Sequence, residues 1–314
     1  MGELEGALPL SNNPGETVVV DEGDNSYPVY SRDGNRLLFV SAKRRAHNQA
    51  QVYEKNLLTG EERRITFHNG DNAFPQYHPR ENLIMYSSST DELKENPPLL
   101  KSGEPVSKLP GPYQRPFEVY THSPTELQIL RVTDHQGFDG EARFVRNQIV
   151  WTRARNDHLE IVSTAHPRQA PTRVKLTGPG EVSSYTVSAD GKSRAWLEWD
   201  AAFGFPKLKL LSGSATAREI APDAVVNKAD LEFSKDGRWL LWAQPEPLSG
   251  RHSLWCYDLK TACVRQLTGK DGDRRHPTLS NDGKWLTFST KRGSRSRIAR
   301  MPFAPATESC AAAP

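Results

Sequence analysis

The sequence of 314 residues lacks any run of about 18 apolar residues, so no segment of it fits a membrane-spanning helix. It also has little net charge, +3 at pH 7, and its Lys and Arg residues are scattered along the chain. A chain that binds nucleic acid usually carries a basic patch, so we do not expect DNA or RNA as a partner. With 36% hydrophobic residues, the chain is still long enough to bury a large core.

Familiar catalytic motifs are missing too. The sequence has no Gly-x-Ser-x-Gly nucleophile elbow, no phosphate-binding loop and no His-Glu-x-x-His zinc motif. Only three cysteines are present, and they do not have the spacing of a zinc site. Residues 1–16 show no charged-then-apolar leader, which leaves a cytosolic start and a start after signal removal both open. The lack of a strong catalytic motif favours a binding protein over an enzyme.

What the sequence does contain is a repeat. The phrase HPTLSNDGKWLTFS (276–289) reads as a short strand, an Asp-Gly turn and a second strand that alternates around aromatic and branched residues. Similar phrases occur at 27–41, 185–199 and 231–243, and the last three turn glycines are spaced by 46 residues. A repeat of roughly 40–50 residues with several strands in each unit is typical of a propeller blade.

Two weaker copies complete the series. At 74–88 and 142–154 the Asp-Gly turn is replaced by Arg-Glu-Asn and by Arg-Asn. The second half of each unit is a strand, a turn and a strand that often ends in Thr, as at Ile65-Thr66 and Leu267-Thr268. The sequence therefore predicts an all-β protein, a six-bladed β-propeller of four-stranded antiparallel blades.

These motifs resemble the TolB-type propeller repeat. The opening is Pro-x-x-Ser-x-Asp-Gly (28–34 and 277–283), the third strand has Tyr-x-x-Asn-Leu (53–57) or Tyr-Asp-Leu (257–259), and the unit ends in Leu-Thr. The resemblance covers about residues 17–303, and the sequence does not include the separate N-terminal α/β domain of that family. It implies a periplasmic propeller of the bacterial cell envelope. It also implies a protein partner, a peptidoglycan-associated lipoprotein docked at the mouth of the channel.

The ring must close on itself. The sixth unit runs out after its third strand, Arg297 to Pro302. We expect the β-branched segment Thr17–Val20 to supply the outer strand of this blade, because closure removes an open sheet edge. Residues 17–303 then form a single propeller domain, residues 1–16 and 304–314 are flexible tails, and we expect a monomer.

The alternation of strand direction sorts the loops onto two faces. The Asp-Gly turns share one face, which we call the turn face. The loops between blades are polar, long and rich in glycine, and they share the other face, the polar-loop face, with the loops between second and third strands. An insertion of residues 90–116 in blade two, rich in proline, falls on the polar-loop face. A loop this long is usually functional or disordered, and a functional one would be a lid over the channel or a contact for a partner.

The expected function is that of a non-catalytic protein-binding or scaffold module, with its partner at the channel mouth on the polar-loop face. Aromatic residues and Arg are the usual anchors of a protein interface. The residues expected to contact the partner are Tyr27, Phe74, Phe138, Tyr185, Arg274, Arg275 and His276.

Three histidines support an alternative function. His68, His135 and His276 lie at or just after loops between blades, which converge at the channel mouth. Neutral imidazoles bind Mn or Zn, and a metal that polarises a carboxylate eases removal of a neighbouring proton. The alternative is a metal-dependent lyase or hydrolase acting on an acidic sugar. If each histidine is instead an ordinary loop residue bonded to backbone, no cofactor is expected.

The cysteines bear on the cellular compartment. Cys256 and Cys263 flank the turn of the blade-five hairpin, where they can face each other across the ladder and form a disulfide. That bond would indicate an oxidising compartment such as the periplasm. The other interpretation is that both are small buried hydrophobic residues. Cys310, in the C-terminal tail, is expected to be a free thiol.

Overall fold

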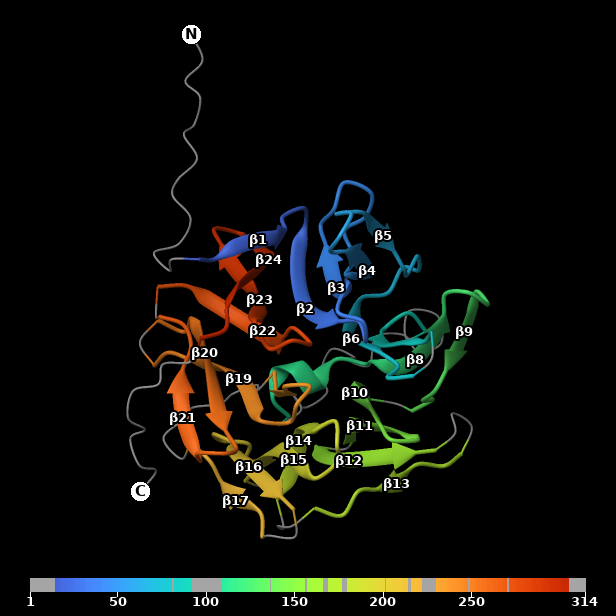
Figure 1. Ribbon diagram of the computed structural model, residues 1–314. Helices are drawn as coiled ribbons and strands as arrows, with labels where there is room; N and C mark the ends of the chain where they lie inside the picture. The colour runs from blue at the N-terminus through green and yellow to red at the C-terminus, as the bar shows by residue number, and fades with distance from the viewer. Residues whose placement is uncertain are drawn as a thin grey trace.

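The computed structural model describes residues 15–80, 82–91, 109–135, 137–155, 157–165, 169–176, 180–200, 202–213, 216–221, 230–247, 249–269 and 271–304. These residues form six four-stranded antiparallel sheets, arranged as the blades of a ring (Figure 1). The predicted six-bladed propeller is confirmed. In the part of the chain that is described, no helix has the length and the apolar character needed to cross a membrane.

In blades 1 to 5 the strands pair in chain order from the ring axis outward, whereas in blade 6 the N-terminal strand is the outermost one. The strands of the first three blades are β2 (Asp24–Tyr30), β3 (Arg36–Ala42), β4 (Gln51–Asn56), β5 (Glu62–Arg64); β6 (Asn72–Tyr77), β7 (Ile84–Ser88), β8 (Glu118–Ser123), β9 (Gln128–Arg131); β10 (Phe138–Val145), β11 (Gln148–Arg155), β12 (His158–Thr164) and β13 (Thr172–Arg173). Those of blades 4 to 6 are β14 (Glu181–Val187), β15 (Ser193–Trp199), β16 (Lys207–Ser212), β17 (Arg218–Glu219); β18 (Glu232–Phe233), β19 (Trp239–Pro245), β20 (His252–Asp258), β21 (Cys263–Gln266); β22 (Asp273–Leu279), β23 (Trp285–Arg292), β24 (Arg295–Pro302) and β1 (Thr17–Val20). The first strands, β2, β6, β10, β14, β18 and β22, contact one another around the axis.

The repeated Ser-x-Asp-Gly motif closes the turns of four blades in the same way. In blade 1, the Ser31 hydroxyl donates to the Asp33 carboxylate (2.5 Å) and accepts the amide of Arg36 at the start of β3 (3.0 Å). Gly34 has φ +77°, a left-handed conformation that favours glycine. The same pair of bonds recurs at Ser188, Ser234 and Ser280. The turn is therefore built entirely from local sequence.

The Thr that ends a unit has an equally specific role. The hydroxyls of Thr66, Thr133 and Thr268 accept backbone amides of third strands, from Val52 (2.9 Å), Val119 (2.8 Å) and Leu254 (2.9 Å). The outer strand is thereby fixed at the point where the chain turns toward the next blade.

The predicted ring closure is confirmed. β1 pairs antiparallel with β24, with Thr17 opposite Arg300 and Val18 opposite Ala299, so the N-terminal strand completes the C-terminal blade (Figure 1). Val20 is buried in a cluster with Phe39 of blade 1 and Ile298 of blade 6. Burying one side chain of this size stabilises the fold by roughly 1.5–3 kcal/mol. Through Val20 the closing strand therefore packs against both blade 1 and blade 6.

The core lies between the blades and is dominated by one aromatic position of the second strand. This position is the fifth residue after the turn glycine in the four clear repeats, and its side chain is almost fully buried in all six blades: Phe39, Tyr86, Trp151, Trp196, Trp242 and Phe288. Large aromatic side chains remove much apolar surface from water, which explains why the second strand is rich in them.

The expected Cys256–Cys263 disulfide is wrong. Cys256 is a buried free thiol. The hairpin register places Cys256 opposite Arg265 and Cys263 opposite Asp258, so the two cysteines are two residues out of register. Diagonal partners are about 7–8 Å apart, beyond the usual reach of a disulfide. Cys310 and residues 1–14 lie outside the described residues.

Candidate functional site

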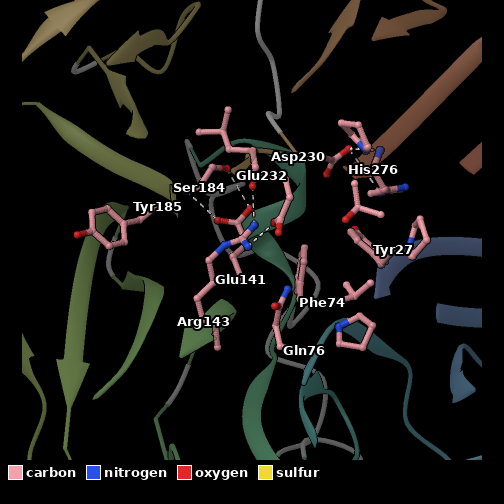
Figure 2. Close-up of a pocket in the computed structure, with 17 residues that line it drawn as sticks. Tyr27, Phe74, Gln76, Glu141, Arg143, Ser184, Tyr185, Asp230, Glu232 and His276 are labelled. Carbon is pink, nitrogen blue, oxygen red and sulfur yellow. Dashed lines mark hydrogen bonds and ion pairs between the residues drawn. The ribbon is translucent and has the colours of Figure 1, made fainter. Parts of the chain in front are cut away.

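The innermost strands surround a small cavity on the ring axis. Its volume is about 70 Å³, room for a few water molecules but not for a sugar or a peptide. Figure 2 shows the polar and aromatic side chains that line it, and they come from all six blades: Tyr27, Phe74, Gln76, Glu141, Arg143, Ser184, Tyr185, Asp230, Glu232 and His276.

A β-bulge recurs in five of the innermost strands. The pairing register shifts at the same level in β2, β6, β10, β14 and β22. At each shift stands one non-glycine residue with φ between +53° and +55°: Tyr27, Phe74, Glu141, Ser184 and His276. Such a conformation costs on the order of 1 kcal/mol or more for each residue. The bulges re-aim these five side chains, and all five line the cavity.

Glu141 is the most heavily bonded group of the cavity. Its carboxylate accepts the Ser184 amide (2.9 Å) and hydroxyl (3.2 Å), the Thr152 hydroxyl (2.8 Å) and the Tyr113 hydroxyl (3.2 Å). A carboxylate that is partly removed from water needs such donors, because losing contact with water without them is costly. Glu141 therefore joins blades 3 and 4 to the insertion, rather than offering a free carboxylate to a ligand.

Tyr113 closes the channel on the polar-loop face. It belongs to the described part of the insertion, in a single 3-10 turn, η1 (Gly111–Gln114), which lies at the centre of the ring (Figure 1). The side chain is only 2% exposed, and its ring packs edge-on against Phe138 (centroids 5.2 Å) and Trp199 (6.5 Å). Burial, with Glu141 alongside, raises the pKa of Tyr113 well above its ordinary value. This part of the insertion acts as a plug; residues 92–108 lie outside the described residues.

An ion pair crosses the channel nearer the turn face. Arg143 of blade 3 contacts Glu232 of blade 5 (2.6 Å) and donates to the Leu231 carbonyl (2.5 Å). Both side chains also line a wider pocket of about 250 Å³ at the mouth on the turn face. The pair thus separates the axial cavity from that mouth.

His276 is held on several sides. Its Nδ1 lies 2.8 Å from the Ser289 hydroxyl, and its Nε2 lies 3.6 Å from the Asp230 carboxylate. The Asp230 carboxylate also accepts a hydrogen bond from the His276 backbone amide (3.2 Å). The centroids of the Tyr27 ring and the His276 imidazole lie 3.9 Å apart. His276 lines both the axial cavity and a groove on the polar-loop face.

That groove lies between blades 6 and 1. Its volume is about 450 Å³, and its charged lining residues are Lys43, Arg275, Lys291, Asp24 and Asp273. Lys43 contacts Asp24 (3.3 Å) and Arg275 contacts Asp273 (3.3 Å). The Lys43 and Arg275 side chains are 67% and 43% exposed, and Lys291 is exposed as well. The groove therefore has accessible cationic groups at its rim.

The residues expected to contact a partner do not form one surface. Tyr27, Phe74, Tyr185 and His276 surround the axial cavity. Phe138 and Arg274 are each 1% exposed; Phe138 lies under Tyr113, while Arg274 bonds Asp271 (3.1 Å) and Glu16 (3.2 Å). Among the seven residues expected to contact a partner, Arg275 is the one whose charged side chain is accessible to solvent.

The three histidines of the alternative function are not brought together. His68 stacks on Tyr86, and the His135 amide donates to Glu118 (2.8 Å), whereas His276 lies on the axis. Burial lowers the pKa of His135. Within the described ranges, no three His, Cys, Asp or Glu side chains lie close enough to hold a metal ion. These histidines therefore do not supply the manganese or zinc ligand set.

The sequence did not single out Glu141, Arg143, Asp230 or Glu232. Charge alone gave no signal for the first two, because other innermost strands, such as β22 with Asp273, Arg274 and Arg275, also carry charged residues. Tyr113 was recognisable as part of an apolar patch with Leu109, but nothing local places it on the axis.

Comparison with known proteins supports the fold. No family model and no curated protein sequence matches this chain. TolB from Acinetobacter baumannii superposes with a TM-score of 0.61 at 14% identity, covering 90% of this chain and 64% of that chain. A putative TolB from Agrobacterium tumefaciens has a TM-score of 0.57 at 14% identity, covering 89% and 90%. An oligogalacturonate lyase in complex with manganese has 0.57 at 11%, covering 92% and 93%.

The chain thus spans less than two thirds of the Acinetobacter protein. At such identities the likeness concerns architecture alone. The chain has the six-bladed propeller fold found in the TolB structures.

Proposed function

We propose that this chain is a non-catalytic binding module that holds a protein partner on its polar-loop face. The observation that carries the proposal is the groove between blades 6 and 1, about 450 Å³, with Lys43, Arg275 and Lys291 at its rim. The axial cavity, at about 70 Å³, is too small for a substrate of sugar or peptide size. The groove is larger than the axial cavity, and it lies on the face where the loops differ from blade to blade.

The chemistry of the groove favours an acidic segment of a protein. Cationic side chains steer an acidic partner toward the site and fix its register. The fold likeness to TolB structures supports a partner of the bacterial envelope, and we propose a peptidoglycan-associated lipoprotein and a periplasmic location.

The test removes charge from the groove. We would measure the affinity of purified peptidoglycan-associated lipoprotein for the intact chain and for the double variant Arg275→Gln, Lys291→Gln. The expected result is at least a tenfold loss of affinity, on the order of the effect of removing interfacial charges. Unchanged affinity would rule out this groove, and no binding by the intact chain would rule out this partner.

A matched control lies on the opposite face. Lys192 and Lys284 are 77% and 76% exposed beside the Asp-Gly turns. The double variant Lys192→Gln, Lys284→Gln changes the net charge by the same amount, so it should bind as the intact chain does. An equal loss in both variants would indicate a general charge effect rather than a site.

A metal-dependent lyase is the second candidate. It is favoured by the manganese-bound oligogalacturonate lyase, of which this chain covers 93%. The described histidines do not fit a common metal, so we derive no reaction step for it. Calorimetric titration with Mn²⁺ decides the matter: saturable binding that His276→Ala abolishes would favour the lyase over the binding module.

A further inference from the structure

The mouth of the channel on the turn face has a wall that repeats from blade to blade. It is a recess of about 250 Å³. In every blade the innermost strand ends in a large apolar residue, and all six of these residues line the recess. We call them the collar: Tyr30, Tyr77, Val145, Val187, Phe233 and Leu279.

The two tyrosines of the collar direct their hydroxyl groups to neighbouring blades. The Tyr30 hydroxyl lies 2.6 Å from the hydroxyl of Thr287 in blade 6, and the Tyr77 hydroxyl donates to the carboxylate of Glu54 in blade 1 (2.8 Å). Burial raises the pKa of both tyrosines, so they stay neutral. The collar therefore offers aromatic and aliphatic surface to a group that enters the mouth, which favours an apolar group.

The mouth is closed at its base. Arg143 of blade 3 contacts Glu232 of blade 5 (2.6 Å) and donates to the Leu231 carbonyl (2.5 Å), so the pair crosses the channel (Figure 2). Behind it lies the axial cavity of about 70 Å³, which Tyr113 covers on the other side. A polypeptide therefore cannot thread through the ring, and it can enter the mouth only with a side chain or with one end.

The rim of the mouth is formed by the variable residue of the Ser-x-Asp-Gly turns. This residue is Ala189 in blade 4, Lys235 in blade 5 and Asn281 in blade 6, and all three line the mouth. The exposed Lys235 ammonium donates to a backbone carbonyl of blade 1 (3.0 Å). Two cations and one carboxylate, Arg143, Lys235 and Glu232, line the mouth and give it a net charge of +1. Because Glu232 pairs with Arg143, the positive charge that remains is at the rim.

The size of the mouth suits one residue of a larger partner. Sites for small molecules usually enclose about 300–1,000 Å³, and this mouth is smaller and open. An apolar side chain would fill the collar, and an anionic group beside it would reach Lys235. In a polypeptide, the C-terminal residue carries a carboxylate on the same Cα atom as its side chain.

We propose that the turn-face mouth binds the apolar C-terminal residue of a partner polypeptide, with its side chain inside the collar and its α-carboxylate paired with Lys235. Burial of the side chain and a charge-assisted hydrogen bond both favour this complex. Several peptide-binding proteins capture a C-terminal carboxylate. This second site lies on the face opposite to the groove between blades 6 and 1, and it does not depend on the function proposed for that groove.

The test compares peptides that differ in one group. An acetylated hexapeptide, Gly-Ser-Gly-Ser-Gly-Leu, is titrated into the full chain by calorimetry, once with a free carboxylate and once as the C-terminal amide. The acid should bind at least tenfold more tightly than the amide, as expected for a hydrogen bond to a charged group. Replacing the terminal Leu by Gly should cause a similar loss. Equal affinity of acid and amide, or no binding by either, would overturn the proposal.

A small carboxylate tests whether the occupant is a polypeptide. 4-Methylpentanoate has the alkyl group and the carboxylate but no peptide backbone. It should bind at least tenfold more weakly than the peptide acid, because it makes fewer contacts with the rim. Equal affinity of the two would overturn the proposal of a polypeptide occupant.

Variants at the rim test the role of Lys235. Lys235→Ala should lower the affinity for the peptide acid about tenfold and leave that for the amide unchanged. Lys284→Ala is the matched control, since Lys284 is 76% exposed beside an Asp-Gly turn but is not part of the mouth, and it should bind as the intact chain does. An equal loss in both variants, or no loss in Lys235→Ala, would overturn the assignment.

Moving the charge to another blade provides a rescue. Ala189 occupies the position of Lys235 in the turn of blade 4, and both residues are exposed. Adding Ala189→Lys to Lys235→Ala returns a cation to the rim and should restore part of the lost affinity for the acid alone. A double variant that binds no better than Lys235→Ala would show that the rim charge does not hold the carboxylate.

Discussion

The two ends of the central channel are built on different plans. At the turn face, four blades use the same Ser-x-Asp-Gly turn, whose bonds join residues within five positions of one another. At the polar-loop face, Tyr113 reaches the axis from an insertion and bonds residues of blades 3 and 4. One end is therefore repetitive and local, and the other is irregular and held by contacts distant in sequence.

The difference between regular and irregular parts of the ring is also seen at single positions of the repeat. Where blade 1 has Gln51, blade 2 has Glu118, and each accepts the hydroxyl of the Thr that ends its unit, Thr66 or Thr133. Gln51 also donates to the carbonyls of His68 (3.1 Å) and Gly70 (3.0 Å). Glu118 instead accepts the amide of His135, and burial raises its pKa to about 7. The irregular end thus places an ionisable group where the regular pattern has an amide.

The largest effect should come from removing the plug. Tyr113→Ala deletes a buried ring between Phe138 and Trp199 and should lower the free energy of unfolding by about 3–5 kcal/mol, because it leaves a cavity on the axis. Tyr113→Phe keeps the ring and removes only the hydroxyl bonds to Glu141 and Ser184, so it should cost about 1 kcal/mol. Urea denaturation measures both. A loss below 1 kcal/mol for Tyr113→Ala would mean that the plug does not stabilise the ring.

The next effect concerns the pH dependence introduced by Glu118. Its pKa is about 7 in the fold and near 4.5 in the unfolded chain, so between these values the folded state binds more protons. Stability should then fall as pH rises from about 5 to 7.5, by up to about 3 kcal/mol. Glu118→Gln resembles the protonated form and should remove this slope. The measurement is the unfolding free energy of both proteins across that range, and equal slopes would contradict the assignment.

The regular end is the part of the molecule that the sequence predicts well. Asp-Gly turns, alternating strands and terminal Thr residues depend on neighbours in the chain, so local pattern identifies them. Ring closure by Thr17–Val20 followed from counting strands, because the sixth blade lacked one. This prediction depended on the whole ring rather than on local pattern, but the requirement was simple, because the open edge of the sixth sheet must be covered.

The irregular end could not be predicted, for three physical reasons. Tyr113 reaches the axis through contacts with Phe138 and Trp199, which are distant in sequence. The bulged residues, such as Tyr27 and Glu141, adopt positive φ although they are not glycine, so no residue type in the sequence marks the bulge. The cysteine error came from register, because the turn length places Cys263 opposite Asp258 and not opposite Cys256.

A moderate effect is expected from the turn hydroxyls. Ser280→Ala removes the acceptor of the Trp285 amide (2.9 Å) and the donor to Asp282 (2.6 Å), and should cost about 1 kcal/mol. Because the turns are alike, the same change at Ser188 or Ser234 should cost a similar amount. Thermal denaturation of the three variants tests this equality. A spread of more than about 2 kcal/mol would show that distant contacts, rather than the local turn, set the stability of this face.

The smallest effect is expected from an exposed ion pair on the turn face, which we compare with a buried ion pair at the other end. Lys284 lies 3.7 Å from Asp282 on the turn face, but the side chains are 76% and 52% exposed, so water screens the attraction. Lys284→Ala should leave the melting temperature unchanged within error. Arg274, at the other end, is 1% exposed and contacts Glu16 and Asp271, so Arg274→Ala should destabilise clearly by leaving buried groups without their cation. Equal shifts for the two variants would remove the distinction between a locally built end and one held by buried contacts between distant residues.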